Sequence, residues 1–339
     1  MTQLSERELA GVASLLIDAG ETVAGQLTAT LVAGGRSNLT YRLDDGTSAW
    51  ALRRPPAGAV IESAHDVARE YRVMAALRST PVPVPRAVVC DATGAVLGVP
   101  AAVVAWVPSH TARSREDVAD WSGDDYQACA TGLVDALAAL HEVDPAAVGL
   151  GEFGRPGSYA ARQLRRWSGQ WLRMDARDVR ADRLHAMLVD MVPDQARTSI
   201  VHGDYRVDNV LLATGESGRV LAIVDWELST LGDSVADVAT MCAYRHPALD
   251  GVLGLEAAWT SEVFPRPEEL RTSYEERTGR SLLAFDFHLA LAFYKLAVIA
   301  EGIAYRHRAG VTAGDGYERV AAMVPILLEQ GLEVASRGG

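Results

Sequence analysis

The first third of the chain consists of short runs in which apolar and polar residues alternate, together with one stretch of helical periodicity. Two of the runs are joined by the turn residues 44–47, a pattern that is typical of a β-hairpin. The helical stretch places Val67, Met74 and Leu77 on one face. The segments predicted here are strands at 39–43, 49–53, 86–90 and 101–107 and a helix at 65–78.

The pattern changes near residue 110, beyond which amphipathic helices alternate with a few short apolar strands. The predicted segments are helices at 126–141, 158–174, 181–191 and 282–308 and strands at 198–202, 209–213 and 220–225. This layout predicts an α+β fold with a small β-rich N-lobe (1–107) and a larger, mainly helical C-lobe (108–339). We find no internal repeat.

Composition and charge narrow the class of protein. The chain has 339 residues, of which 49% are apolar and 22% charged, as in an ordinary globular protein. Its formal net charge is −12, so a general nucleic-acid binder is not expected. The apolar segment 289–305 is interrupted by Lys295 and Glu301, so no membrane-spanning helix is expected there. The first eight residues do not resemble a secretory signal.

The three cysteines, Cys90, Cys129 and Cys242, lie far apart and form no C-x-x-C pair. This spacing argues against a zinc site or a disulfide framework and favours a reducing compartment. We therefore expect a soluble cytoplasmic protein. The segment 149–154 matches G-x-G-x-x-G, but it follows a helix rather than a strand, so we interpret it as a connecting loop.

The most informative stretch contains two polar clusters, 202–209 and 225–227, each flanked by apolar residues. Asp204 and Asn209 are five residues apart, and Asp225 ends the apolar run 221–224. Protein-kinase-like phosphoryl transfer uses an Asp for the hydroxyl, an Asn five residues later and a second Asp for metal. Hard divalent cations such as Mg²⁺ prefer oxygen ligands. The alternative interpretation is a pair of polar turns between core strands.

The first lobe contains candidates for the complementary half of such a site. Residues 33–38 form a glycine-containing turn at which backbone N–H groups can approach phosphates. Glu70 lies on the apolar face of its predicted helix and therefore needs a cationic partner. Arg53 ends the strand at the position where kinases carry a phosphate-pairing Lys. The alternative for Glu70 is a place at the rim, paired with a surface Arg.

These residues carry a family resemblance. The chain resembles the aminoglycoside phosphotransferase/choline kinase-like family, which shares the protein-kinase-like two-lobe fold, and in particular the branch related to the kinase-like domain of certain acyl-CoA dehydrogenases. The resemblance covers essentially the whole chain. The segments that carry it are 34–41, 52–56, 64–71, 202–209, 225–227 and 232–239.

The resemblance implies roles for particular residues. Asp204 is implied to be the catalytic base or the residue that orients the hydroxyl, and Asn209 and Asp225 to hold Mg²⁺. Arg53 and Glu70 are implied to be the phosphate-positioning pair. The remaining implied positions are Gly34, Gly35, Arg36, Ser37 and Asn38 over the nucleotide phosphates, Val104, Ala105 and Val107 at the adenine, and His202 and Asp237 in support of the loop.

One position departs from the family, because most members have Lys where this chain has Arg53. Arg keeps the charge and binds phosphate in a forked geometry, but it is bulkier than Lys. Arg54 is expected to point to the other face of the strand.

The acceptor side is less clearly marked. Glu227, Tyr294, Glu301 and Arg306 are candidates for substrate contact. Residues 155–185 contain eight Arg against three Asp, which indicates either a solvated helix pair or a contact with an anionic acceptor. A polycationic aminoglycoside requires an acidic cleft, whereas a hydroxy-acid or acyl-CoA acceptor requires an Arg-lined one.

We therefore expect an ATP- and Mg²⁺-dependent phosphotransferase acting on a hydroxyl of a small molecule. A nucleotide-binding pseudokinase or regulatory module without transfer activity is the alternative. The expected partners are a nucleotide and a hydroxylated acceptor, with no nucleic acid and no membrane, in a monomer or homodimer.

Overall fold

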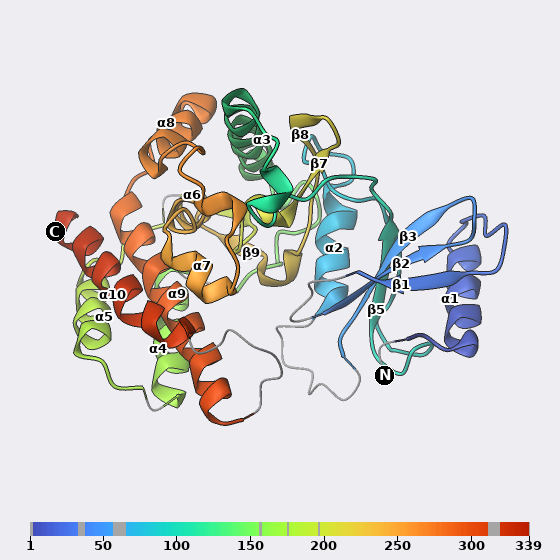
Figure 1. The fold of residues 1–339 in the computed structure, drawn as a ribbon, viewed down its shortest axis with the longest axis horizontal. Helices are drawn as coiled ribbons and strands as arrows, with labels where there is room; N and C mark the ends of the chain where they lie inside the picture. Colours follow the sequence, from blue (N-terminus) through green and yellow to red (C-terminus); the bar gives the residue numbers. More distant parts are fainter. Residues whose placement is uncertain are drawn as a thin grey trace.

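A computed structural model describes residues 3–32, 38–56, 66–155, 158–174, 176–195, 197–310 and 319–338 of the chain. A five-stranded antiparallel sheet forms its N-terminal part, and one helix covers each face of the sheet (Figure 1). In spatial order the strands are β1 (Thr28–Leu31), β2 (Leu39–Asp44), β3 (Ala49–Arg54), β5 (Ala101–Ala105) and β4 (Ala87–Asp91), and the helices are α1 (Glu6–Asp18) and α2 (Val67–Leu77).

Successive side chains of β3 point alternately toward α1 and toward α2. Trp50 and Leu52 are buried in the core shared with α1, whereas Ala51 packs toward the core shared with α2. Arg53 therefore lies on the α2 face. Arg54 lies on the α1 face, as alternation predicts, where it bonds the Tyr41 hydroxyl and lies 3.8 Å from Glu8 of α1.

Helix α1 was not among the predicted segments, although its sequence contains a recognisable start signal. The Ser5 hydroxyl accepts a bond from the Glu8 N–H while the Glu8 carboxylate accepts from the Ser5 N–H, which is a capping box. Val12 and Leu16 are then buried against the sheet. The pattern Ser-x-x-Glu before an apolar stripe was sufficient to find this helix.

The C-terminal part is mainly helical, with two short antiparallel strand pairs between the helices. Its helices are α3 (Gly123–Glu142), α4 (Tyr159–Arg173), α5 (Val179–Asp190), α6 (Ser234–Ala243), α7 (Ala248–Leu253), α8 (Pro267–Thr278), α9 (Phe285–Arg308) and α10 (Val320–Arg337). The strand pairs are β6 (Ser199–Val201) with β9 (Thr230–Gly232) and β7 (Val210–Ala213) with β8 (Glu216–Ile223). Short 3₁₀ turns are η2 (Glu116–Val118), η3 (Val207–Asn209), η4 (Trp226–Leu228) and η5 (Ala258–Thr260).

Helix α9 is the central helix of this part and packs along α10, α6 and α4. By length and composition it is the one helix among the described residues that is able to cross a membrane, but 78% of its apolar window is buried inside the protein. A core helix of a soluble protein passes the same test, so this feature is weak evidence for a membrane span.

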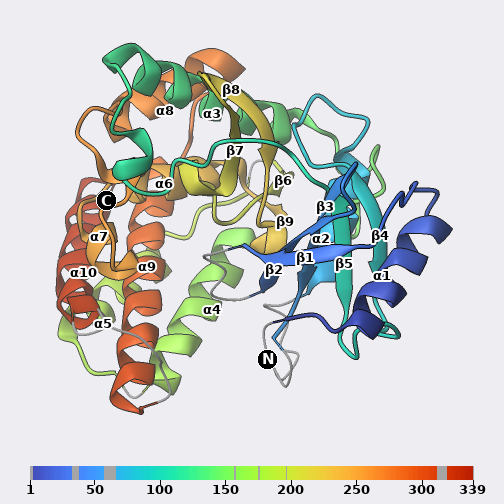
Figure 2. The same ribbon diagram turned by 45° about the vertical axis from the view of Figure 1, so that its right-hand side comes forward.

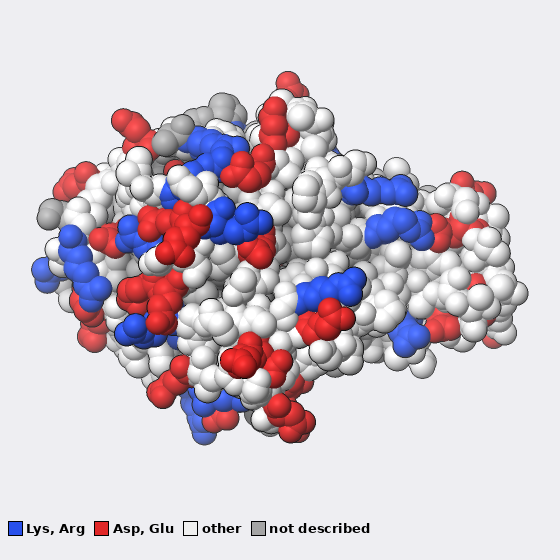
Figure 3. Space-filling model, turned by 90° about the horizontal axis from the view of Figure 1, so that it is seen from above, with Lys and Arg blue, Asp and Glu red and all other residues white. Residues whose placement is uncertain are grey.

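The acidic balance of the chain does not gather into one patch on the face shown in Figure 3, where acidic and basic side chains are interspersed.

The predicted fold class is confirmed, and the element bounds differ by a few residues. The predicted strand 101–107 ends at Ala105, just before the chain leaves the sheet. The strand predicted at 220–225 runs instead over Glu216–Ile223, so that Asp225 follows it by two residues. The loop at 149–154 lies in turns after α3 with no strand before it, as expected for a connection. The helices α6, α7, α8 and α10 were not predicted.

Helix α3 and the β7–β8 hairpin lie side by side because glycines on both sides remove the side chains between them (Figure 2). A Cβ at Gly132 would fall well inside van der Waals contact of the Gly218 carbonyl oxygen, and a Cβ at Gly218 would lie 3.0 Å from the Ala128 side chain. This hairpin follows directly from the loop that carries Asp204, so the contact fixes the loop against α3.

We predict that Gly132→Ala destabilises the protein by about 1–3 kcal/mol, since the added methyl group forces two backbones apart. Gly169→Ala in α4 is the control, because a Cβ there meets no atom within 4 Å and Ala favours the helix. Denaturant unfolding of both variants is the measurement. Equal stability of Gly132→Ala and the native chain would contradict the packing argument.

Candidate functional site

The loop between β6 and β7 carries Asp204 and is fixed by a buried carboxylate from α6. Asp237 accepts the His202 N–H at 2.6 Å and the Gly203 N–H at 2.8 Å. His141 of α3 lies 3.2 Å from the same carboxylate and 2.7 Å from the Tyr274 hydroxyl. Burial would raise the pKa of Asp237, but His141 and the backbone donors lower it below its usual value. An ionised Asp237 therefore fixes the course of the loop.

Gly203 is required at its position in this loop. Its φ is +82°, and a Cβ would lie 2.8 Å from the Leu228 carbonyl oxygen. The chain can thus turn sharply directly before Asp204.

The Asp204 carboxylate is surrounded by donors. Oδ1 accepts a hydrogen bond from the Tyr244 hydroxyl and lies 3.7 Å from the Lys295 ammonium, while Oδ2 accepts from Asn209 Nδ2 at 3.2 Å. Burial opposes the charge, but Arg206, Lys295 and Tyr244 outweigh it and hold the pKa of Asp204 at about 2. Asp204 is therefore a carboxylate at neutral pH and a weak base.

Asn209 lies next to this carboxylate, and its backbone carbonyl oxygen accepts a hydrogen bond at 2.9 Å from the N–H of Val224, the residue before Asp225. The Asn209 amide nitrogen donates both of its bonds to Asp204, which leaves its side-chain carbonyl oxygen as a possible ligand atom. Asp225 begins η4 in the left-handed conformation, with φ +66° and ψ +55°. A non-glycine residue held in this region is typical of functional sites.

A single guanidinium joins the two parts of the molecule at this point. Arg53 of β3 lies 3.2 Å from Glu70 of α2 and donates to Asp225 at 2.9 Å. Asn38 donates to the other oxygen of Glu70 at 3.1 Å. The predicted cationic partner of Glu70 is thus Arg53, and Glu70 is buried rather than at the rim.

The same position gathers three carboxylates. One oxygen each from Glu70, Asp225 and Glu227 lies within 4.8 Å of the others. Burial raises the pKa of Glu70 to about 8, and Arg53 only partly offsets this effect, which Asp225 and Glu227 reinforce. Three carboxyl groups share one guanidinium, so this oxygen-rich donor set fits a further hard cation such as Mg²⁺.

A second arginine fixes helix α2 against the C-terminal part. Arg69 donates to the carbonyl oxygens of Ser229 and Phe153 at 2.9 Å each, and its guanidinium lies 3.7 Å from the centre of the Phe153 ring. Glu70, the next residue on α2, is thereby held toward η4.

The end of β5 forms the connection between the two parts. Val104 is buried, and the Ala105 N–H already donates to the Arg86 carbonyl oxygen at 2.8 Å. Val107 follows the strand, and its N–H makes no hydrogen bond within the described part of the chain. Of the three residues predicted to meet adenine, Val107 therefore offers a backbone donor. Gly34, Gly35, Arg36 and Ser37 lie outside the described residues.

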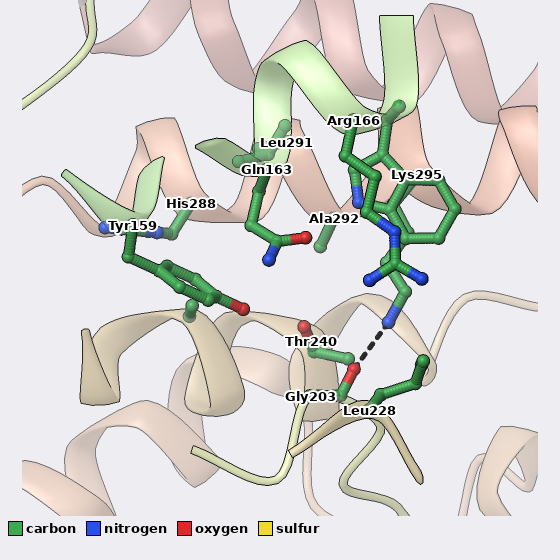
Figure 4. A pocket seen from close by; sticks show the side chains of 12 residues that line it. Tyr159, Gln163, Arg166, Gly203, Leu228, Thr240, His288, Leu291, Ala292 and Lys295 are labelled. Carbon is green, nitrogen blue, oxygen red and sulfur yellow. Dashed lines mark hydrogen bonds between the residues drawn. The ribbon is translucent and has the colours of Figure 1, made fainter. Parts of the chain in front are cut away.

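A pocket that is partly open to solvent lies beside the Asp204 loop (Figure 4). In this view Tyr159 and His288 lie at one side, Arg166 and Lys295 at the other, and Gln163 and Thr240 between them. Lys295 donates to the Gly203 carbonyl oxygen at 2.7 Å. The complete lining is Tyr159, Gln163, Arg166, Trp167, Gly203, Leu228, Ala236, Thr240, His288, Leu291, Ala292 and Lys295.

The acceptor-side residues expected from the sequence do not line this pocket. Tyr294 is buried beside His185, Glu301 pairs with Arg308 at 2.5 Å, and Arg306 is exposed. Glu227 lies with Glu70 and Asp225 instead. The pocket uses another face of α9, which carries His288 and Lys295.

Sequence reasoning missed Tyr244 and Lys295 as neighbours of Asp204. Lys295 carried a signal, because it is the one Lys within an apolar helix and a buried ammonium needs a partner. Tyr244 carried none, since it follows an apolar helix and has no distinctive spacing.

Comparisons with known proteins agree with this geometry. Residues 28–271 match the model of a family described as the phosphotransferase enzyme family. A protein of Ralstonia eutropha JMP134, whose assignment as an aminoglycoside phosphotransferase is provisional, has a solved structure with a TM-score of 0.82 and 30% identity, covering 97% of this chain and 98% of that one. An aminoglycoside phosphotransferase in complex with ADP and hygromycin B shares the fold, with a TM-score of 0.59, 14% identity, and coverage of 96% of this chain and 98% of that chain.

Curated relatives are longer than this chain. Acyl-CoA dehydrogenase family member 11 of Gallus gallus is 33% identical over 324 residues, which is 93% of this chain and 41% of that protein. Member 10 of Mus musculus is 31% identical over 310 residues, which is 90% of this chain and 29% of that protein. The chain thus spans less than half the length of these relatives.

His288 gives a pH-dependent prediction. Burial lowers the pKa of His288 to about 4 from an ordinary 6.5, so the folded protein holds it neutral. Below pH 6.5 the unfolded chain binds a proton that the folded chain does not, and stability falls as the pH is lowered toward 4. At pH 5 this loss is about 2 kcal/mol.

The measurement is the free energy of unfolding at pH 7 and pH 5 for the native chain and for His288→Gln, which does not titrate. The variant is expected to lose less stability than the native chain between the two values. Equal losses would show that His288 is not held neutral.

Proposed function

Because the chain belongs to the phosphotransferase enzyme family, we propose that it is an ATP- and Mg²⁺-dependent phosphotransferase that moves the γ-phosphoryl group to a hydroxyl of a small molecule. The observation that carries this proposal is the convergence of Asp204, Asn209 and Asp225 with the Arg53–Glu70 pair, at the meeting point of the two parts of the fold. Phosphoryl transfer depends mainly on positioning and charge, which this arrangement supplies.

Asp204 acts in this proposal by orienting the acceptor hydroxyl. Its low pKa makes it a poor proton acceptor in the ground state, but its two fixed oxygens are strong hydrogen-bond acceptors. The hydroxyl of Tyr244 already donates to Oδ1, so a hydroxyl is a group that this carboxylate binds. The proton passes to Asp204 only as the oxygen forms its bond to phosphorus.

Asn209 and Asp225 are the residues that would hold Mg²⁺, with Glu227 beside them. When bound, the cation neutralises charge on the nucleotide phosphates. Arg53 contributes a fixed positive charge next to the same position, and Glu70 keeps its guanidinium on the α2 face of the sheet.

The comparisons support nucleotide use, because a protein that shares this fold was solved in a ternary complex with ADP and hygromycin B. The name of the curated relatives refers to proteins of which this chain matches less than half. We therefore propose transfer activity for this chain rather than dehydrogenation. A nucleotide-binding module without transfer activity is the outcome that the next experiment distinguishes.

We expect Asp204→Asn to lower ATP-dependent phosphorylation of a metabolite extract by about 10²-fold or more, because the hydroxyl loses its orienting carboxylate. ATP should still raise the melting temperature of this variant, since Asp204 is not a nucleotide ligand here. Asp190→Asn on the surface of α5 is the control. Undiminished turnover in Asp204→Asn would overturn the assignment, and stabilisation by ATP without turnover in the native chain would favour the regulatory module.

Asp225→Asn tests the metal ligand with little change to the backbone, because Asn tolerates the left-handed conformation. The Mg²⁺ concentration that gives half of the maximal rate is expected to rise by about tenfold or more. Chelation of divalent cations should abolish turnover in the native chain. An unchanged Mg²⁺ dependence in Asp225→Asn would exclude this residue as a ligand.

A further inference from the structure

The pocket beside Asp204 has an unusual balance of charge. Two of its lining side chains, Arg166 and Lys295, are cationic, and none of the lining residues is acidic. Both cationic groups lie at the same side of the pocket (Figure 4). A space lined in this way repels a polycationic ligand and attracts an anionic one.

The two cations differ in how their charge is used. Lys295 is buried and already has partners, because its ammonium donates to the Gly203 carbonyl oxygen and lies 3.7 Å from Asp204. Its charge therefore stabilises the loop that carries Gly203 and Asp204.

Arg166 makes no hydrogen bond or ion pair with any residue that the structure describes, and its guanidinium lies 5.1 Å from the centre of the Trp167 ring. Its five N–H donors face solvent and the pocket.

The neighbourhood of Arg166 favours an incoming anion. Arg166 is close enough to Lys295 to help lower the pKa of that ammonium, after the larger effect of burial. Part of the Arg166 side chain is exposed, but the protein atoms around it shield it from water enough to lower its pKa, in spite of the opposing influence of Tyr159 and Glu227. Two like charges side by side are unfavourable, and a carboxylate or phosphate between them would relieve the repulsion.

The opposite side of the pocket is polar and uncharged. Both ring nitrogens of His288 are buried without a hydrogen-bond partner within the described part of the chain, and the nearest carboxylate oxygen, from Asp233, is 3.8 Å away. Tyr159, Gln163 and Thr240 add further neutral polar groups. This side can bind uncharged polar atoms, so the discrimination by charge depends on Arg166.

We propose that Arg166 binds an anionic oxygen group of the acceptor, a carboxylate or a phosphate, while the acceptor hydroxyl lies at Asp204. This inference rests on the proposed phosphoryl transfer and names the class of its acceptor. None of the pocket residues comes from the N-terminal sheet, and neither Asn209 nor Asp225 lines it, so the cations lie on the acceptor side rather than around the nucleotide. A polycationic aminosugar is not the acceptor.

The test compares matched probes for equilibrium binding, measured by calorimetry in the presence of Mg²⁺ and a non-hydrolysable ATP analogue. The probes are short 2-, 3- and 4-hydroxycarboxylic acids, their primary amides, glycerol phosphate and a polycationic aminosugar. The proteins are the native chain, Arg166→Gln and the control Arg165→Gln, which changes the adjacent exposed arginine outside the pocket.

We expect at least one anionic probe to bind about tenfold or more tightly than its neutral counterpart, and Arg166→Gln to remove this advantage. Arg165→Gln should preserve it. The acid or the phosphate series identifies which anion is preferred. The proposal is overturned if no anionic probe binds more tightly than the neutral ones, if the aminosugar binds best, or if both variants lose the preference equally.

Failure of this proposal differs from failure of the proposed function. If a neutral or cationic acceptor is phosphorylated and its phosphorylation is undiminished in Arg166→Gln, the anion-site proposal is wrong and the phosphotransferase proposal stands. If anions bind in a way that depends on Arg166, but no phosphoryl group passes from ATP to any bound probe or extract component, the anion-site proposal stands and the phosphotransferase proposal is wrong. Where turnover is seen, Arg166→Gln should raise KM with little change in kcat, since the contact is made equally before and during reaction.

Discussion

The interaction on which the rest of the site depends is the sharing of the Arg53 guanidinium between Glu70 and Asp225. It joins a strand and a helix of the N-terminal part to the turn that begins η4 in the C-terminal part. The Glu70 side chain is buried, whereas that of Asp225 is 31% exposed, so the Glu70 carboxyl depends more strongly on Arg53 as its partner. The contact therefore sets the distance between the two parts, and with it the place where a nucleotide would lie.

A second constraint works at the other side of the site, where Asp237 holds the loop before Asp204 by two backbone N–H bonds. Because Asp237 fixes the loop, Asp204 keeps its position, while Arg206, Lys295 and Tyr244 keep it ionised. The two constraints act on different parts of the site. In the proposed reaction, the Arg53 contact orients the groups around the phosphates, and Asp237 orients the loop whose Asp204 receives the hydroxyl.

Local patterns predicted the parts of this arrangement that depend on neighbours in sequence. The β2–β3 hairpin and α2 follow from alternation and helical periodicity. Glu70 on an apolar face indicated a cationic partner, which the structure identifies as Arg53. Helix α6 was missed because nine of its ten residues are buried and it has no polar face. Helix α10 contains Pro325 and Gly331, which weaken a helical pattern.

Local sequence patterns could not predict the pocket beside Asp204. Arg166, His288 and Lys295 come from two helices far apart in the chain, and only packing shows which face of α9 turns toward Asp204. The sequence presented Arg166 as one of eight arginines, and nothing in the spacing separated it from those that pair on the surface.

The most direct test of the account follows the phosphoryl group itself. The native chain is incubated with Mg²⁺, a metabolite extract and ATP labelled with ¹⁸O in the γ-phosphoryl group, and the products are examined by mass spectrometry and NMR. The account predicts a small molecule that carries the labelled group as a phosphate ester on a former hydroxyl. Binding of ATP with no labelled product other than inorganic phosphate would contradict it.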